Sequence, residues 1–250
     1  MTRIICLASG KGGVGKTTLT ANLAAALAGF KKSVIAIDSS LGTSNLGFHL
    51  GIPLYPRTVQ DIMNKDVRVK DSIYYHKSGF MVIPADISLK KIIVPRASEF
   101  VDIFYTLIGD ADFILIDSAA GLGQESLAAV EAADELITVT NPELPAITDA
   151  LKLGEIAKAL GTRNIGVVIN RIRNEKHEMP VDDVKDFLDL PIIGQVPEDR
   201  SVMEAVASKE PVVTHKPKSH AAQHFKAIAA YLIGEEYKVK KPFSFFGWLK

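Results

Sequence analysis

Residues 10–18 read GKGGVGKTT, and this stretch decides how the rest of the chain must fold. It fits the pattern G-x-x-x-x-G-K-[ST] from Gly10 to Thr17, after the apolar run RIICLAS and before the helical pattern KTTLTANLAAALA. A glycine-rich loop between a buried strand and a helix is the setting in which backbone N–H groups surround phosphate oxygens. The stretch therefore predicts a loop that binds the phosphates of a nucleotide.

Each residue type in this loop has a physical reason for its place. Glycine lets the backbone curl until successive N–H groups point inward. Lys16 supplies a positive charge to the β- and γ-phosphates, and the hydroxyl of Thr17 is a ligand for Mg²⁺. The residues predicted to bind phosphate are Gly10, Lys11, Gly12, Gly13, Val14, Gly15, Lys16, Thr17 and Thr18.

Apolar runs rich in Ile and Val recur after the loop, and they predict strands that are buried on both faces. These runs read SVIAID, GFMVIPA, DFILIDS, DELITVT, NIGVVIN and PIIGQVP. Helical patterns such as SEFVDIFYTLIG and ITDALKLGEIAKALG separate most of them. The sequence predicts an α/β fold, a doubly wound and mainly parallel sheet flanked by helices. We expect one P-loop nucleotide-binding domain over residues 1–234, followed by a basic linker and amphipathic tail over residues 235–250.

The composition excludes several classes of protein. The 29 Lys and Arg residues balance 29 Asp and Glu residues, so no broad positive field favours nucleic acid. The one cysteine, Cys6, lies in an apolar run, which excludes a disulfide framework and predicts a buried thiol in a reducing compartment. The N-terminal apolar stretch is too short for a signal peptide, and nowhere do eighteen apolar residues run together. We expect a cytoplasmic protein.

Two aspartates stand at strand ends, where ligands bind in open α/β sheets. Asp38 closes SVIAID and Asp117 closes DFILIDS. A carboxylate at either place can hold Mg²⁺ through its water shell, although a strand-end aspartate can also be a turn residue or a helix cap. We predict a magnesium site formed by Thr17, Asp38 and Asp117.

Further motifs give the sequence a family resemblance. KGGVGKTT with its early lysine, DSAAGLG, VTNPE, VVINR and VPEDRSVMEAVASKEPVV, in this order, resemble the MinD/ParA family of P-loop ATPases, and most closely its MinD branch, which includes archaeal MinD-like proteins. The resemblance runs from Met1 to about Leu232 and implies ATP and Mg²⁺ as cofactors. It also implies that Lys11 reaches the phosphates of a partner subunit in an ATP-dependent homodimer. The alternative is a solvated loop lysine.

The resemblance assigns further residues. Gly121 corresponds to the switch that senses the γ-phosphate, and Ala119 stands where the family often has proline. Asn170 corresponds to the adenine contact, because its amide both donates and accepts hydrogen bonds. The full set implied for adenine is Asn170, Arg171, Pro197, Glu198 and Asp199.

The stretch IDSSLGTSN departs from the family. The family usually has a second aspartate at the position of Ser40, where it positions the attacking water. A neutral serine can hold a water by a hydrogen bond but cannot accept its proton near neutral pH. The catalytic set implied by the resemblance is therefore Lys11, Lys16 and Ser40, with ATP hydrolysis expected to be slow.

The last residues, KKPFSFFGWLK, combine lysines with aromatic side chains. Basic residues followed by an aromatic face are typical of a segment that lies in the membrane interface, and this one is far too short to span. The alternative is a tail packed on its own core or on a partner subunit. The residues predicted to contact membrane are Phe243, Phe245, Phe246, Trp248 and Leu249.

These features predict an ATP-dependent dimerisation switch that binds membrane reversibly and recruits an unidentified cargo or activator protein, as in the organisation of a division site or cell pole. The rival is a ParA-type partition ATPase that binds DNA non-specifically. The charge balance and the aromatic tail argue against DNA as a partner. A metal-cluster carrier would need a cysteine pair, which one cysteine cannot provide.

Overall fold

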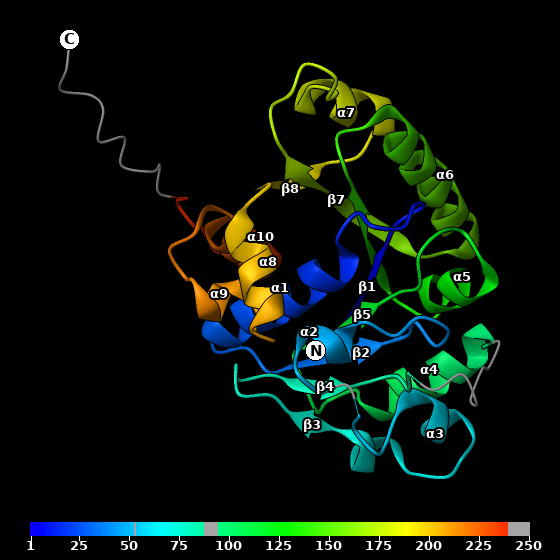
Figure 1. Cartoon of the computed structure of the whole chain (residues 1–250). Coiled ribbons are helices and arrows are strands. Elements are labelled where there is room, and N and C mark those ends of the chain that lie inside the picture. The colour runs from blue at the N-terminus through cyan, green and yellow to red at the C-terminus, as the bar shows by residue number, and fades with distance from the viewer. Residues whose placement is uncertain (53, 88–94, 240–250) are drawn as a thin grey trace.

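The computed structural model describes residues 1–52, 54–87 and 95–239 (Figure 1). These residues form an eight-stranded sheet in the order β3-β4-β2-β5-β1-β6-β7-β8. The strands are β1 Arg3–Ala8, β2 Val34–Asp38, β3 Tyr74–Tyr75, β4 Met81–Ile83, β5 Phe113–Asp117, β6 Glu135–Thr140, β7 Arg163–Ile172 and β8 Ile192–Pro197. Every neighbouring pair is parallel except β3 with β4. The predicted fold class is therefore confirmed.

Helices cover both faces of this sheet (Figure 1). They are α1 Lys16–Gly29, α2 Leu46–His49, α3 Val59–Met63, α4 Ala97–Thr106, α5 Gln124–Glu131, α6 Leu144–Leu160, α7 Val181–Leu188, α8 Arg200–Ala207, α9 Val212–His215 and α10 His220–Leu232, with a 3₁₀ helix at Val69–Ser72. Alternate residues of β1 supply two cores. Ile5 and Leu7 pack with α1 and α10, whereas Ile4 and Cys6 pack with α4 and α5. Cys6 is buried as predicted, and burial raises the pKa of its thiol.

The structure adds one strand to those predicted. Every predicted apolar run forms a strand, but Tyr74–Tyr75 pairs antiparallel with β4 at the sheet edge. Two residues are too short to produce an alternating pattern. None of the helices in the described residues is both long and apolar enough to cross a membrane. The predicted membrane contacts lie outside the described residues: Phe243, Phe245, Phe246, Trp248 and Leu249.

The parallel register brings several loops to one edge of the sheet. Asp38 pairs with Asp117, and Leu7 pairs with Asp117 from the other side. The loops at residues 9–15, 39–45 and 118–123 therefore start from neighbouring strand ends. This is the edge where a ligand of a doubly wound sheet is expected.

Candidate nucleotide site

The phosphate loop connects β1 to α1 and depends on glycine for two different reasons. Gly13 and Gly15 have φ values of 80° and 96°, which side chains rarely adopt. At Gly10 a Cβ atom would overlap the backbone of Asp149 in α6, and at Gly15 it would overlap the amide of Asn170. The tight packing of β7 and α6 against the loop explains these two positions.

Lys16 lies inside the loop, with only 7% of its surface exposed. Its Nζ donates a hydrogen bond to Ser9 Oγ over 3.0 Å. Burial lowers the pKa of Lys16, and the nearby carboxylate of Asp117 opposes this change. A buried cation held by one neutral hydroxyl is suited to a phosphate oxygen, since an anion would compensate its charge.

Ser9 joins three parts of the site and was not among the predicted site residues. Its hydroxyl donates to the backbone oxygen of Lys11 over 2.7 Å as well as accepting from Lys16. Its backbone oxygen accepts from the N–H of Gly121 over 3.1 Å. The residue proposed to sense the γ-phosphate thus contacts the phosphate loop directly. The one available signal was the place of Ser9 immediately before the motif.

The two strand-end aspartates form a buried acidic pair. Asp117 is 1% exposed and Asp38 is 0% exposed. Burial raises the pKa of Asp117 to about 7, with a further contribution from the charge of Asp38, while hydrogen bonds from Thr17 and Thr20 act in the opposite direction. Burial also raises the pKa of Asp38, to about 6. Two buried carboxylates near one lysine leave negative charge that a cation would compensate.

This donor set fits Mg²⁺, which prefers hard oxygen ligands and usually takes one or two carboxylates together with water and substrate phosphates. Thr17 and Asp117 would hold the ion, because a hydrogen bond already joins their side chains. Within the described parts of the chain, no three His, Cys, Asp or Glu side chains gather as a metal site. A metal here would therefore depend on the nucleotide for its remaining ligands.

The carboxylate of Asp38 accepts several hydrogen bonds from the loop that follows β2. Its carboxylate accepts hydrogen bonds from Ser40 N over 3.0 Å, Ser44 Oγ over 2.8 Å and Leu46 N over 3.1 Å. It thus stabilises the loop and the start of α2, although the N-cap residue of that helix is Asn45. A magnesium role for Asp38 would act through water and stays a prediction.

Ser40 lines the cavity beside the phosphate loop. This cavity has a volume of about 230 Å³ and is bounded by Lys16, Thr17, Ser40, Ser118 and Arg171, among others. The hydroxyl of Ser40 interacts with Thr43, at 3.1 Å from the Thr43 hydroxyl and 3.3 Å from its carbonyl oxygen. Ser40, which is expected to hold the attacking water, therefore lies at the site, but its hydroxyl also contacts Thr43 of its own loop.

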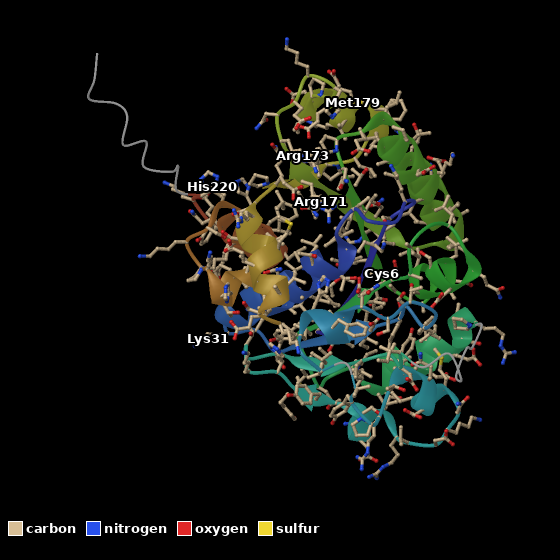
Figure 2. All side chains as sticks on the ribbon, in the orientation of Figure 1. Cys6, Lys31, Arg171, Arg173, Met179 and His220 are labelled. Carbon is tan, nitrogen blue, oxygen red and sulfur yellow. The ribbon has the colours of Figure 1, made fainter. Side chains whose placement is uncertain are left out.

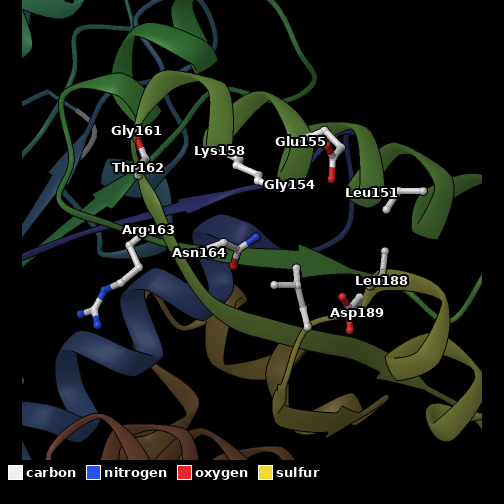
Figure 3. A pocket seen from close by; sticks show the side chains of 11 residues that line it. Leu151, Gly154, Glu155, Lys158, Gly161, Thr162, Arg163, Asn164, Leu188 and Asp189 are labelled. Carbon is white, nitrogen blue, oxygen red and sulfur yellow. The ribbon is translucent and has the colours of Figure 1, made fainter.

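A larger cavity of about 440 Å³ lies elsewhere, between α6 and the segment from α7 to β8 (Figure 3). Glu155, Lys158, Arg163, Asn164 and Asp189 are among the residues that line it. Arg163 begins β7, so this cavity is at the opposite edge of the sheet from the phosphate loop. It contains none of the predicted site residues and is not part of the nucleotide site.

The residues implied for adenine gather at the ends of β7 and β8. Asn170 is 5% exposed, and its Nδ2 donates to the backbone oxygen of Val14 over 2.7 Å. Arg171 has a positive φ of 59° and lies with Arg173 at the end of β7 (Figure 2). Asn170 therefore holds the phosphate loop at Val14, a contact that the sequence did not suggest.

The other residues implied for adenine are Pro197, Glu198 and Asp199, and they make contacts within the protein. Pro197 is the last residue of β8. Glu198 donates its backbone N–H to Ile172 O over 2.9 Å, and its carboxylate lies 3.6 Å from Arg173. Asp199 caps α8 by accepting from Ser201 N over 2.8 Å. A contact of this segment with adenine stays a prediction.

Lys11 differs from Lys16 in every respect. Its side chain is 46% exposed, and its Nζ lies 3.5 Å from Glu143 Oε2 at the start of α6. Among the described residues, its Nζ makes no hydrogen bond or ion pair with its own phosphate loop. The loop therefore holds one lysine inside and one outside.

Comparisons with known proteins identify the family of this chain. The family model of the CobQ/CobB/MinD/ParA nucleotide binding domain matches residues 5–212, and the chain belongs to this family. An uncharacterized ATP-binding protein of Methanocaldococcus jannaschii is 42% identical over 236 residues, 94% of this chain and 89% of that protein. Within the family, the chain is a MinD-like P-loop ATPase, which confirms the resemblance predicted from the sequence.

Two solved structures support this narrower assignment. The septum site-determining protein MinD of Pyrococcus horikoshii, complexed with Mg-ADP, is 35% identical with a TM-score of 0.89, over 93% of this chain and 96% of that one. A chain of the MinC:MinD cell division protein complex of Aquifex aeolicus is 31% identical with a TM-score of 0.86, over 96% of this chain and 99% of that one.

Proposed function

We propose that this protein is an ATP-dependent dimerisation switch that binds membrane in its ATP state and recruits a partner protein to a division site or cell pole. The observation that carries the proposal is the contrast between the two lysines of one loop. Lys16 is buried in its own cradle, whereas Lys11 projects from the same loop with nearly half of its side chain exposed.

Lys16 and the loop N–H groups bind the triphosphate of ATP. Thr17 and Asp117 would hold Mg²⁺ beside the phosphates, where the ion would supply positive charge. Because Lys11 lies outside the phosphate loop of its own subunit, its side chain can reach the phosphates of a second subunit. A cation delivered in this way compensates the triphosphate only when two subunits close face to face.

Dimerisation then controls membrane binding through the tail. Full burial of a large apolar side chain is worth about 1.5–3 kcal/mol, but an interfacial segment buries only one face. Ordering a segment costs roughly 1–2 kcal/mol of backbone entropy per residue, so one tail binds weakly. Two tails on one dimer act together, and avidity can strengthen binding by about 10²–10⁴-fold.

Hydrolysis of ATP ends the cycle, and it is slow because Ser40 cannot accept the proton of the attacking water. The partner that accelerates or uses this cycle is a protein. A similar chain, MinD of Aquifex aeolicus, is solved in a complex with MinC, which supports a protein partner of a comparable kind. The balanced charge of this chain disfavours DNA.

The test is sedimentation with anionic liposomes in the presence of ATP or ADP, with the full chain and with a chain lacking residues 243–250. We expect the full chain to sediment only with ATP, and the shortened chain to form ATP-dependent dimers that stay in solution. A shortened chain that still sediments would contradict the anchor. Salt-dependent binding to DNA without binding to liposomes would support the partition ATPase instead.

A further inference from the structure

The carboxylate of Glu125 joins two loops of the nucleotide site that are far apart in the sequence. Glu125 lies in the first turn of α5. Its Oε1 accepts a hydrogen bond from the N–H of Leu41 and another, over 3.1 Å, from the N–H of Gly42. These donors belong to the loop after β2, which contains Ser40, and α5 lies beside this loop in Figure 1.

The first of these bonds holds the peptide unit that joins Ser40 to Leu41. The Leu41 N–H belongs to the planar peptide unit that begins at the carbonyl of Ser40. On its other side Leu41 accepts a bond at its carbonyl oxygen from Gln60 Nε2 over 3.2 Å, and its side chain is 3% exposed. Because Leu41 is held at its N–H, its carbonyl and its side chain, the peptide plane next to Ser40 has little freedom.

Glu125 is also tied to the loop after β5. That loop, residues 118–123, leads from Asp117 to the start of α5 and contains Gly121. Gly121 donates its N–H to Ser9 O over 3.1 Å, and Ser9 Oγ accepts from Lys16. A continuous chain of contacts thus runs from the phosphate loop through Gly121 and α5 to the peptide beside Ser40.

A carboxylate in the first turn of a helix is favourable even without a partner, because the helix dipole attracts it. That effect requires no hydrogen-bond partner from another part of the protein. Here the carboxylate instead receives two backbone donors from another loop, and the Leu41 N–H is partly buried. Replacing Glu125 by alanine would leave this N–H with poor access to water.

We propose that Glu125 is a positioning residue that fixes Ser40 relative to the loop proposed to sense the γ-phosphate. A shift of the Gly121 loop on ATP binding moves α5, and Glu125 transmits that movement to Ser40. The inference rests on the proposed function in one respect, the hydrolysis of ATP in this cavity. Glu125 does not line the cavity, so its loss affects turnover rather than nucleotide affinity.

The test compares Glu125→Ala, Glu125→Gln and Glu131→Ala in the full chain. Glutamine keeps an oxygen that accepts both bonds, and Glu131 is an exposed glutamate at the other end of the same helix. In nucleotide-free protein we expect the amides of Leu41 and Gly42 to exchange about 10–100-fold faster in Glu125→Ala. We expect the same variant to lose roughly tenfold or more in kcat with the Kd for ATP within about twofold. The other two variants should resemble the wild type.

Wild-type exchange in Glu125→Ala would contradict the bridge. Faster exchange with unchanged kcat would reduce Glu125 to a local contact and overturn the proposal. Loss of kcat in Glu131→Ala would also overturn it, because the effect would then follow charge on α5 rather than the bridge. A wild-type chain that binds ATP without hydrolysing it contradicts the proposed hydrolysis, while the exchange rates still test the bridge on their own.

Discussion

Lys11 Nζ lies 3.5 Å from Glu143 Oε2, so an ion pair joins the phosphate loop to the start of α6. Both side chains are nearly half exposed, and pairs of this kind contribute about 0–1 kcal/mol. Glu143 therefore orients Lys11 without retaining it. A triphosphate from a second subunit offers a far larger negative charge and would displace this contact at little cost.

Lys16 is expected to be essential for nucleotide binding. Lys16→Ala removes the buried cation of the cradle and should abolish Mg-ATP binding in calorimetry. Ser9→Ala leaves the cation in place and removes two hydrogen bonds, one from Lys16 and one to Lys11 O, so it should weaken binding by about 10–100-fold at most. Near-native affinity of Lys16→Ala would contradict the phosphate-loop assignment.

Asn170 is expected to act in two ways. Its bond to Val14 O fixes the phosphate loop, so Asn170→Ala should weaken binding of every nucleotide, including free triphosphate. If its amide also reads adenine, the wild type should bind ATP much better than GTP, and the variant should lose this preference. Equal losses for ATP and GTP would leave Asn170 with the structural role alone.

Ser40→Asp is expected to accelerate steady-state ATP hydrolysis, because a carboxylate next to the phosphate loop can accept the proton of water. Asparagine has the shape of aspartate but cannot accept a proton, so Ser40→Asn should hydrolyse ATP at the wild-type rate or below. A fast wild-type enzyme, or equal acceleration by both variants, would show that another group has this role.

Asp117 is expected to make the metal-free protein less stable as pH rises. Its pKa is raised in the folded state, so it contributes stability fully below about pH 4, and this contribution is lost as pH rises through about 7. Asp117→Asn should therefore gain unfolding free energy relative to the wild type between pH 5 and pH 8, on the order of a few kcal/mol.

Urea unfolding without Mg²⁺ or nucleotide at these two pH values measures the effect. Asp134→Asn, which changes an exposed carboxylate at the other end of the sheet, is the control and should show no such change. A pH-independent difference between Asp117→Asn and the wild type would contradict the buried acidic pair.

The strands and the phosphate loop could be predicted because their signals are local. Buried parallel strands read as apolar runs, and the glycine spacing of residues 10–15 follows from φ values and close contacts. The contacts of Asp38, Asn170 and Glu125 could not be predicted. Each joins a side chain to a backbone group in a loop whose conformation has no periodic pattern, and Glu125 finds its partners 84 and 83 residues earlier in the chain.

The central claim is that Lys11 acts on a second subunit, and analytical ultracentrifugation of Lys11→Ala with ATP and Mg²⁺ tests it most directly. Glu143→Gln is the matched control, because it removes the partner of Lys11 and leaves the lysine in place. We expect Lys11→Ala to bind ATP and remain a monomer, while Glu143→Gln dimerises within about fivefold of the wild type. A Lys11→Ala chain that dimerises with ATP as the wild type does would contradict the account.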